Sequence, residues 1–324
     1  MDEVPTDTSA QHLPHWQRAF LQRHQLATGY LTTARRYFDP LAERLARQHA
    51  GAAQSCVVGL NGSQGSGKST LADYLVCYLI EECGLSALAL SLDDFYLTRS
   101  ERASLARDVL PLFATRGVPG THAVALLLDC LGDLVASTTV AVPRFAKEQD
   151  DRVPRSEFTP VEGAVDVIIL EGWCLGARGD RDEDLAVAVN DLEREEDADG
   201  AWRRYADACL KSTYVELYDR LDFWVMLQAP GFEQVLRWRS EQEEKLRSRV
   251  RGQGVALMDD AALRRFVAHY ERHTRQCLRD LPDQVDVLYR LDENRRIVAS
   301  RGLDLGASLA HDQSSGSGLN QDQG

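Results

Sequence analysis

The stretch Gly62-Ser63-Gln64-Gly65-Ser66-Gly67-Lys68-Ser69-Thr70 decides the fold, because it matches the pattern G-x-x-x-x-G-K-[ST] of a phosphate-binding loop. An apolar run at residues 56–60 precedes it and is typical of a buried parallel strand. Residues 71–83 follow with apolar side chains at helical spacing. A strand, a glycine-rich loop and a helix in this order are the context in which the motif binds nucleotides.

The residue types of the loop suit the phosphates of ATP. Glycines let backbone N–H groups approach phosphate oxygens, and the helix that follows directs its positive end at the same anion. We expect Lys68 to reach the β- and γ-phosphates and Ser69 to ligate Mg²⁺ through its hydroxyl. The alternative, a glycine-rich turn with a chance lysine, is disfavoured by the two flanking elements. The loop predicts nucleotide binding and leaves the reaction open.

The composition narrows the classes of function. The chain has 324 residues and a formal net charge of −13, whereas proteins that bind nucleic acids generally present a basic surface. Its seven cysteines form no C-x-x-C pair, which favours reduced thiols. No apolar run is long enough to cross a bilayer, and residues 1–14 lack the apolar core of a signal peptide. We expect a cytoplasmic protein that binds neither nucleic acid nor membrane; its oligomeric state stays open.

Apolar runs that alternate with segments of helical periodicity predict an α/β fold. In such a fold the strands form a parallel sheet with helices on both faces. The expected strands are residues 56–60, 87–92, 165–170, 221–227 and 285–291, and the expected helices include 16–50, 71–83, 123–135, 202–221, 232–251 and 259–281. Within 16–50 we expect a second helix to start at Pro40. The acidic stretch 180–200 is expected to be exposed.

Carboxylates follow two of the expected strands. Asp93 and Asp94 come after residues 87–92, at the edge where open α/β sheets bind ligands. The alternative for this pair is a solvated turn or a helix cap, since Asp is a favoured cap residue. Glu171 ends the most apolar strand, which is the position of a carboxylate that supports Mg²⁺.

Basic residues gather in two loops of this acidic chain. Arg116 and His122 bound a loop with two glycines and a proline, and Thr121 is the expected N-cap of the helix that follows. Arg144 and Lys147 lie close together after a short strand, with Arg152 nearby. Either loop suits an anionic substrate or the phosphates of ATP. The alternatives are a plain surface histidine and a solvated charged loop.

The helix expected at residues 232–251 carries many arginines and glutamates. Most of this pattern is typical of a face stabilised by i,i+4 ion pairs. Enzymes that transfer phosphoryl groups also need a mobile cationic lid that covers the phosphate and excludes water. We expect a lid around residues 232–258, with Arg239 as its first candidate cation.

Together the motifs resemble the phosphoribulokinase/uridine kinase-like branch of P-loop kinases, and more narrowly the D-glycerate 3-kinase group and its uncharacterised relatives. Asp-Asp-Phe-Tyr, Arg-Gly-x-Pro-Gly-Thr-His and Glu-Gly-Trp are more specific to this group than the phosphate-binding loop alone. The matching stretches lie at residues 62–70, 91–96, 116–122, 143–152, 170–173, 190–193 and 238–243.

The resemblance implies ATP-dependent phosphorylation of a small-molecule hydroxyl, with D-glycerate as leading acceptor. It implies that Asp93 is the general base, that Glu171 supports Mg²⁺ and that Arg239 stabilises the phosphoryl group. Lys68 completes the predicted catalytic set, and all residues of 62–70 are expected to hold the nucleotide. The residues expected to bind an anionic acceptor are Asp94, Tyr96, Arg116, His122, Arg144 and Lys147.

Two departures from the family pattern keep other functions open. Ala123 and Ala146 stand where family members usually have aspartates that accept hydrogen bonds from acceptor hydroxyls. The alternatives are a kinase for another small acceptor, such as a nucleoside or a pantothenate-like compound, and an ATP-binding regulatory protein with little phosphotransfer. In either case we expect a disordered terminus at 1–14, a helical segment at 15–50 packed on a kinase domain at 51–305, and a disordered tail at 306–324.

Overall fold

The computed structural model describes residues 12–52, 54–136, 139–249 and 259–304. Its centre is a six-stranded sheet of β1 Cys56–Gly62, β2 Ala87–Ser91, β7 Val167–Gly172, β8 Phe223–Gln228, β9 Val287–Leu291 and β10 Ile297–Arg301. The strand order is β10-β9-β8-β1-β7-β2. All neighbours pair in parallel except β10, which runs antiparallel to β9 at one edge. The prediction of an α/β fold with a mainly parallel sheet is confirmed.

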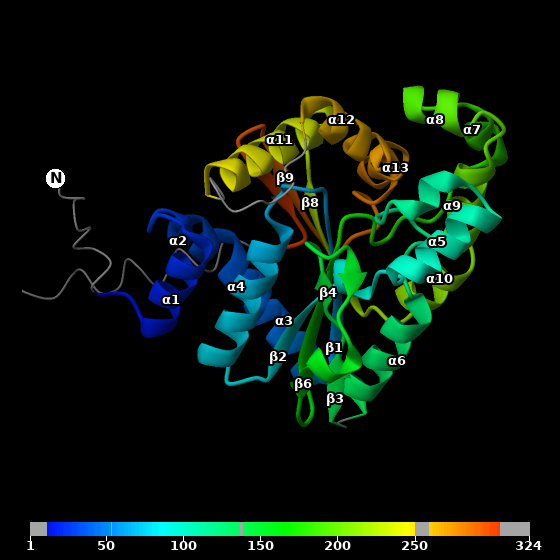
Figure 1. Ribbon diagram of the computed structural model, residues 1–324. Coiled ribbons are helices and arrows are strands. Elements are labelled where there is room, and N and C mark those ends of the chain that lie inside the picture. Colours follow the sequence, from blue (N-terminus) through cyan, green and yellow to red (C-terminus); the bar gives the residue numbers. More distant parts are fainter. Residues whose placement is uncertain (1–11, 53, 137–138, 250–258, 305–324) are drawn as a thin grey trace, which may run out of the picture.

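One face of the sheet is covered by the N-terminal helices and by the helix of the phosphate-binding loop (Figure 1). These elements are α1 His15–His24, α2 Tyr30–Thr33, the π-helical turn η2 Ala34–Phe38, α3 Asp39–Ala52 and α4 Lys68–Glu81. α2, η2 and α3 follow one another without a break, and Pro40, which has no backbone N–H to donate, is the second residue of α3, directly after the π-helical turn.

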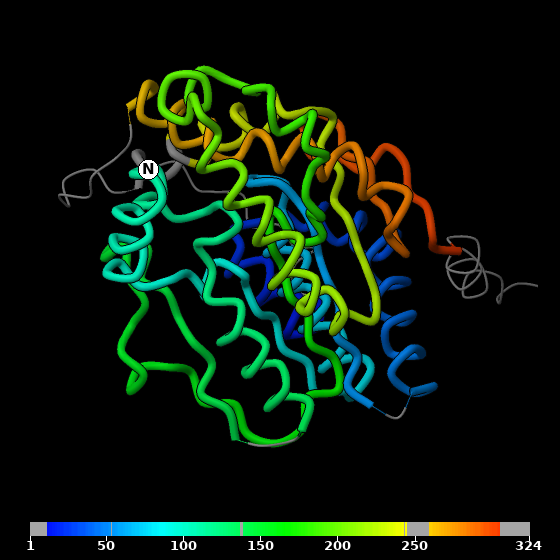
Figure 2. Tube along the Cα trace, turned by 90° about the vertical axis from the view of Figure 1, so that its right-hand side faces the viewer, coloured from blue at the N-terminus to red at the C-terminus, as the bar shows by residue number. Residues whose placement is uncertain are grey.

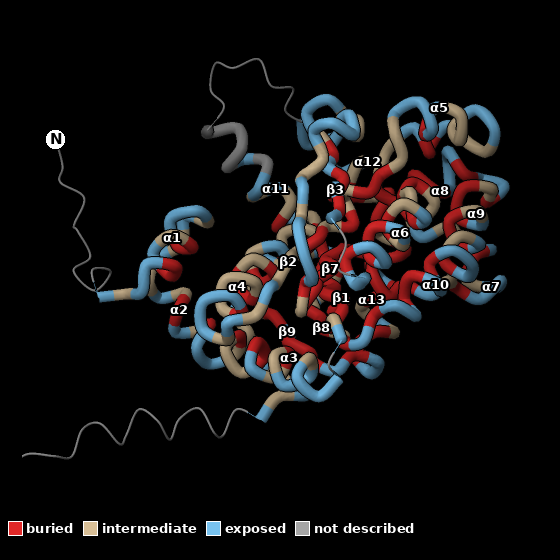
Figure 3. The backbone as a smooth tube through the Cα atoms, turned by 90° about the horizontal axis from the view of Figure 1, so that it is seen from below, coloured by how far each residue is buried: buried red, intermediate tan, exposed pale blue. Residues whose placement is uncertain are grey.

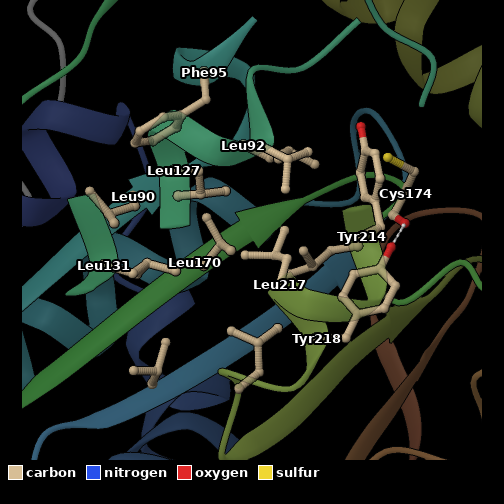
Figure 4. Close-up of a cluster of buried hydrophobic side chains, with 14 of the residues drawn as sticks. Leu90, Leu92, Phe95, Leu127, Leu131, Leu170, Cys174, Tyr214, Leu217 and Tyr218 are labelled. Atoms are coloured by element: carbon tan, nitrogen blue, oxygen red, sulfur yellow. Dashed lines mark hydrogen bonds between the residues drawn. The ribbon is translucent and has the colours of Figure 1, made fainter. Parts of the chain in front are cut away.

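The opposite face packs against α6 Val124–Val135, α9 Ala201–Leu210, α10 Thr213–Tyr218 and α13 Glu271–Asp280. Successive side chains of β7 point alternately to the two faces of the sheet. Val167 and Ile169 belong to the core beneath α3 and α4, whereas Ile168 and Leu170 belong to the core beneath α6 and α10. Both faces are therefore buried, which explains the unbroken apolar run in the sequence. Figure 3 shows this burial along the sheet, and Figure 4 shows part of the second core around Leu127, Leu170 and Leu217.

Further helices lie above the edge of the sheet where β8 ends. They are α11 Phe232–Arg249 and α12 Asp260–Ala268, which continues toward α13. Figures 1 and 2 both show α12 and α13 along the top of the molecule. The remaining elements are the helices α5 Arg99–Asp108, α7 Asp182–Ala186 and α8 Asp191–Glu196, the 3₁₀ turns η3 Leu92–Phe95, η4 Pro111–Ala114 and η5 Arg155–Glu157, and two small antiparallel pairs, β3 Val140–Val142 with β6 Thr159–Val161 and β4 Phe145–Ala146 with β5 Asp151–Arg152.

Three of the expected helices are interrupted. The segment 16–50 breaks between α1 and α2, where Gln25 has φ of 54°. The segment 202–221 divides into α9 and α10, and 259–281 divides into α12 and α13. The last break, at His269 and Tyr270, turns α13 back onto the core, where Tyr270 is buried. Apolar periodicity continues across such a break, so it does not mark it.

The expectation that the acidic stretch 180–200 is exposed is wrong for its key residues. Asp180, Glu193 and Asp197 are buried. Arg272 of α13 donates to Glu193 at 2.6 and 2.8 Å and pairs with Asp180 at 3.3 Å. Arg203 pairs with Asp197 at 2.9 Å. Because Arg272, which is distant in the sequence, and Arg203, which is six positions from Asp197, supply the compensating charge, these carboxylates are stable inside the protein.

The predicted disordered terminus at 1–14, the predicted lid at 232–258 and the predicted disordered tail at 306–324 fall partly or wholly on residues 1–11, 250–258 and 305–324, which lie outside the described residues. Of the first stretch, residues 12–14 are described, and Leu13 packs against the core. Among the helices that the structure describes, none is long and apolar enough to cross a membrane. The seven cysteines are free thiols, and Cys56, Cys130, Cys174 and Cys277 are buried, in agreement with the reduced state expected from their spacing.

Candidate active site

The phosphate-binding loop joins β1 to α4 and has the backbone that its glycines permit. Gly65 and Gly67 have φ of 78° and 94°, in the left-handed region. A Cβ on Gly65 would lie 2.7 Å from the Cβ of Trp238, which is too close for any larger residue. The hydroxyls of Ser63 and Ser66 are buried without a hydrogen-bond partner. Unpaired polar groups beside the N-terminus of a helix fit the phosphates of a nucleotide.

Lys68 and Ser69, in the first turn of α4, meet Glu171 from the end of β7. The hydroxyl of Ser69 donates to Oε1 of Glu171 at 2.8 Å, and Nζ of Lys68 lies 3.6 Å from Oε2. β1 and β7 are neighbours in parallel register, so the two motifs end side by side. A hydroxyl and a carboxylate beside a phosphate site are the ligands that Mg²⁺ uses in kinases. The described residues include no cluster of three or more His, Cys, Asp or Glu that could hold a metal by itself.

Asp93 lies in the turn after β2 and has two polar partners. Lys147 donates to its Oδ2 at 2.9 Å, and the hydroxyl of Tyr96 donates to its Oδ1 at 2.8 Å. Burial by itself raises the pKa of Asp93, but the charges of Lys147 and Lys68 outweigh burial and hold the pKa at about 2. The same pairing raises the pKa of Lys147. Asp93 is therefore an ionised carboxylate with two neighbouring cations at neutral pH.

These groups share a cavity of about 310 Å³ at the carboxyl edge of the sheet. Four cationic side chains and two carboxylates line it, so the cavity attracts anions. Gln64 and Gly65 contribute from the phosphate-binding loop. The other lining residues are Lys68, Ser69, Asp93, Tyr96, Arg116, Lys147, Glu171, Trp173, Arg239, Gln242, Phe266 and Tyr270. Arg239 comes from α11, and its guanidinium lies 5.8 Å from the ring centre of Phe266.

The hairpin of β4 and β5 brings Lys147 to this cavity and is anchored through Asp150. The Asp150 carboxylate pairs with Arg116 and, at 2.7 Å, with the buried Arg102 of α5. Asp150 has φ of 54°, an uncommon conformation for a residue other than glycine. A hairpin with two paired residues per strand is not stable alone, so these anchors determine where Lys147 lies.

Asp94 and Arg144 lie beside the cavity and do not line it. Asp94 accepts hydrogen bonds from the backbone N–H of Phe145 and from Arg144, both at 3.2 Å. It therefore fastens the start of the β4–β5 hairpin to the turn after β2. Arg152, at the other end of the hairpin, pairs with Glu101 of α5 at 3.1 Å.

His122 is buried behind Tyr96, and the interpretation of His122 as a surface residue is wrong. The His122 and Tyr96 rings stack with their centres 4.6 Å apart, and Nδ1 is hydrogen-bonded to the hydroxyl of Tyr214. Burial lowers the pKa of His122 to about 4, so the ring is neutral at pH 7. The prediction that Thr121 caps α6 is also wrong. Its hydroxyl donates to the carbonyl of Val118 and accepts from the N–H of Gly117, because the loop needs these bonds to close on itself.

Sequence reasoning missed four lining residues: Trp173, Gln242, Phe266 and Tyr270. Trp173 follows the end of β7, two positions after Glu171, and its place at the same sheet edge is a signal that the sequence does carry. Tyr270 lies at the break between α12 and α13, and its hydroxyl donates to the carbonyl of Arg116 at 3.2 Å. The sequence carries no signal for this contact, since the partners are 154 positions apart.

A phosphate-binding loop on a parallel sheet, a carboxylate beside it and a small charged cavity next to both define the class of P-loop kinases. No protein-family model matches the chain. The chain is 32% identical over 245 residues to the uncharacterized kinase mug58 of Schizosaccharomyces pombe, a match that covers 72% of this chain and 84% of that protein.

The chain is also 32% identical over 232 residues to the chloroplastic D-glycerate 3-kinase of Arabidopsis thaliana, which covers 66% of this chain and 46% of that longer protein. Among solved structures, the D-glycerate 3-kinase of Cryptococcus neoformans superposes with a TM-score of 0.68 at 25% identity, over 85% of this chain and 99% of that one. The chain therefore belongs to this family of glycerate kinase-like P-loop kinases, and the resemblance inferred from the motifs is confirmed.

Proposed function

We propose that the protein transfers the γ-phosphoryl group of ATP to a hydroxyl of a small anionic hydroxy acid, with D-glycerate as the first candidate. The observation that carries the proposal is the meeting of Lys68, Glu171 and Asp93 in one cavity that also contains Arg116 and Lys147. The names of two relatives, both D-glycerate 3-kinases, support the choice of acceptor.

The loop is suited to the nucleotide by its backbone and its unpaired hydroxyls. Residues 62–70 would hold the phosphates through N–H groups, with Ser63 and Ser66 available as further donors. Ser69 and Glu171 would hold Mg²⁺, and the ion would neutralise charge between the β- and γ-phosphates. Nζ of Lys68 lies 3.6 Å from Glu171, and when ATP binds Lys68 would exchange this contact for one with a phosphate oxygen.

Asp93 is the group that would orient the acceptor hydroxyl. A carboxylate with a pKa of about 2 is a weak base, but phosphoryl transfer needs placement and charge neutralisation more than strong proton abstraction. In this role Asp93 accepts a hydrogen bond from the hydroxyl and takes its proton late, as the bond to phosphorus forms. Lys147 keeps the carboxylate ionised and is available to contact the transferred group.

The remaining cations would hold the acid group of the acceptor and the charge that develops on phosphate. Arg116 is partly exposed to the cavity, and an arginine binds carboxylates through two parallel hydrogen bonds. Arg239 on α11 is suited to cover the γ-phosphate from above. Asp94, His122 and Arg144 would act indirectly, by supporting Tyr96 and the β4–β5 hairpin.

A different small acceptor is the second candidate, and Ala146 favours it. Ala146 lies in β4, next to Lys147, where an aspartate would add an acceptor for hydroxyls. Ala123 contributes only its backbone N–H, which donates to the carbonyl of Phe95 at 2.7 Å. Neither alanine lines the cavity.

The test is ADP release from Mg·ATP with a panel of small hydroxy acids and alcohols, led by D-glycerate, with Lys68→Ala as the blank. We expect turnover with D-glycerate that Asp93→Asn lowers about 10²- to 10⁴-fold. If only another compound is turned over, that compound and not D-glycerate is the acceptor. ATP binding without turnover on any acceptor contradicts the kinase proposal and favours a regulatory ATP-binding protein.

A further inference from the structure

The loop of residues 116–122 brings Arg116 to the acceptor cavity, and it lies between η4 and α6, outside both helices. Two aromatic side chains from other parts of the chain hold its first two carbonyl groups. The hydroxyl of Tyr270 donates to the carbonyl of Arg116 at 3.2 Å, and Nε1 of Trp173 donates to the carbonyl of Gly117 at 3.1 Å. The main chain at Arg116 is therefore placed by residues that also line the cavity.

The loop and Tyr270 approach each other as closely as a glycine permits. Gly117 has φ of 139°, and a Cβ at this position would collide with the hydroxyl of Tyr270. The rings of Tyr270 and Trp173 meet edge to face, with their centres 4.7 Å apart. Burial raises the pKa of Tyr270, so its hydroxyl keeps its proton at neutral pH and remains a donor to the loop.

The far end of the Arg116 side chain is held by the β4–β5 hairpin. Its guanidinium pairs with Asp150 and lies 5.3 Å from the ring centre of Phe145. The side chain is 23% exposed, so part of it still faces the cavity. A guanidinium binds a carboxylate through two parallel hydrogen bonds only in one orientation, which makes the placement of both ends important. Tyr270 fixes one end, and Asp150 fixes the other.

Tyr270 also lies next to the phosphate side of the cavity. Its ring centre is 4.9 Å from that of Phe266 in α12, and the guanidinium of Arg239 lies over the Phe266 ring. The ring of Tyr270 therefore packs in the wall between two cations of the cavity, whereas its hydroxyl bonds to the loop. Because these two contacts use different atoms, a change that removes only the hydroxyl separates them.

We propose that Tyr270 is a positioning residue for the acceptor: through the carbonyl of Arg116 it sets where the guanidinium meets the acid group of a small hydroxy acid. The inference rests on the proposed function, because it needs an anionic acceptor beside Arg116. Tyr270 acts through Arg116 and makes no bond to the phosphates of ATP. Its hydroxyl therefore affects binding of the acceptor and leaves binding of the nucleotide unchanged.

The experiment measures steady-state kinetics of Tyr270→Phe with D-glycerate and Mg·ATP. Phenylalanine keeps the ring that packs against Trp173 and Phe266 and removes the hydrogen bond to the loop. We expect the KM for D-glycerate to rise about three- to tenfold, the effect of one lost hydrogen bond. The KM for ATP should stay the same, and kcat should change little.

Tyr218→Phe is the matched control. Tyr218 is also buried, and its hydroxyl donates to a backbone carbonyl, that of Cys174, at 3.5 Å. Tyr218 is not among the described residues that line the acceptor cavity. We expect this variant to keep the KM of the unmodified protein for both substrates. Urea denaturation of both variants shows whether each is folded, so that a loss of stability is not mistaken for a loss of acceptor binding.

A double-mutant cycle tests whether Tyr270 acts through Arg116. Arg116→Lys keeps the charge but lacks the paired donors of the guanidinium, so it should raise the KM for D-glycerate by itself. Adding Tyr270→Phe to Arg116→Lys should then raise the KM little further, because the two residues act as one unit. Independent, multiplying effects of the two substitutions would overturn the inference.

Two other results contradict the inference, and a third contradicts the proposed function. If Tyr270→Phe leaves the KM for D-glycerate unchanged, the hydroxyl does not position the acceptor. If it raises the KM for ATP and for D-glycerate equally, its role is structural. If the unmodified protein turns over no D-glycerate, the proposed acceptor is wrong, and the inference falls with it.

Discussion

Two ion pairs in this protein each join a basic and an acidic side chain, but they differ in how far they are exposed to a ligand. Arg272 and Glu193 pair where their side chains are 4% and 1% exposed. Backbone carbonyls of Asp184 and Val187 accept further hydrogen bonds from the Arg272 guanidinium. Lys147 and Asp93 pair at the cavity, where they are 57% and 30% exposed. The first pair is closed and satisfied, whereas the second is open to a ligand. A closed pair specifies structure, and an open pair can exchange its partner for a substrate.

The strongest way to test the open pair is to neutralise Asp93. Asp93→Asn keeps the shape of the side chain but cannot accept a proton, so we expect kcat to fall about 10²- to 10⁴-fold with little change in ATP affinity. Steady-state kinetics and ATP titration check both quantities. Asp94→Asn, at the neighbouring residue outside the cavity, should have a much smaller effect. Equal losses in the two variants would contradict the assignment of Asp93.

The closed pair is tested by Glu193→Gln, which leaves the buried Arg272 with less compensating charge. We expect the free energy of unfolding to fall by about 3 kcal/mol, because removing one charge of a buried pair leaves the other charge buried with less compensation. Urea denaturation gives this value. Asp191→Asn is the control two residues away, in the exposed pair with Arg194, and it should change stability by at most about 0.5 kcal/mol. If Glu193→Gln and Asp191→Asn lost similar amounts of stability, burial of the Arg272–Glu193 pair would not matter for stability, which contradicts the distinction between closed and open pairs.

Both regions also contain buried histidines, and two of them, His122 and His273, predict a loss of stability in acid. Burial lowers the pKa of His122, behind the cavity, and of His273, on α13, to about 4 from 6.5. Between these values the unfolded chain binds a proton that the folded chain does not, so stability falls as pH falls.

At pH 5 we expect each histidine to lower the free energy of unfolding by about 2 kcal/mol relative to pH 7.5. Urea denaturation at the two pH values measures the loss. His122→Gln and His273→Gln should each reduce the pH dependence by that amount, and an unchanged dependence in both variants would contradict the burial argument.

The smallest expected effect concerns the hairpin that carries Lys147. Asp150→Asn removes the charge that pairs with Arg102 and Arg116, so Lys147 should be held less well at Asp93. We expect kcat to fall about tenfold, equivalent to ~1.4 kcal/mol, with unchanged ATP affinity. Glu148→Gln makes the same charge change at an exposed position of the same turn and should leave kcat unaltered. If the variant lost ATP affinity and kept its kcat, Asp150 would support nucleotide binding and not the position of Lys147.

The motifs that are short in sequence were the most predictable part of the site. Lys68 and Ser69 follow from one loop, and Glu171 follows from the end of an apolar strand, because parallel strands that are neighbours end at the same edge. Asp93 follows from the same rule. The contribution of the β4–β5 hairpin was only partly predictable, since the cluster of Arg144 and Lys147 gives no direction for either side chain.

The sequence by itself determined the fold class, the positions of the main strands along the chain and the position of the phosphate-binding loop, since local periodicity and glycine chemistry act over a few residues. The tertiary structure alone decided which charges are buried and which are available. Glu193 and Asp93 are both acidic residues in charged stretches. Their roles differ because the fold pairs Glu193 with the buried Arg272 and Asp93 with the exposed Lys147. Those partners are 79 and 54 positions away, beyond the reach of any local pattern.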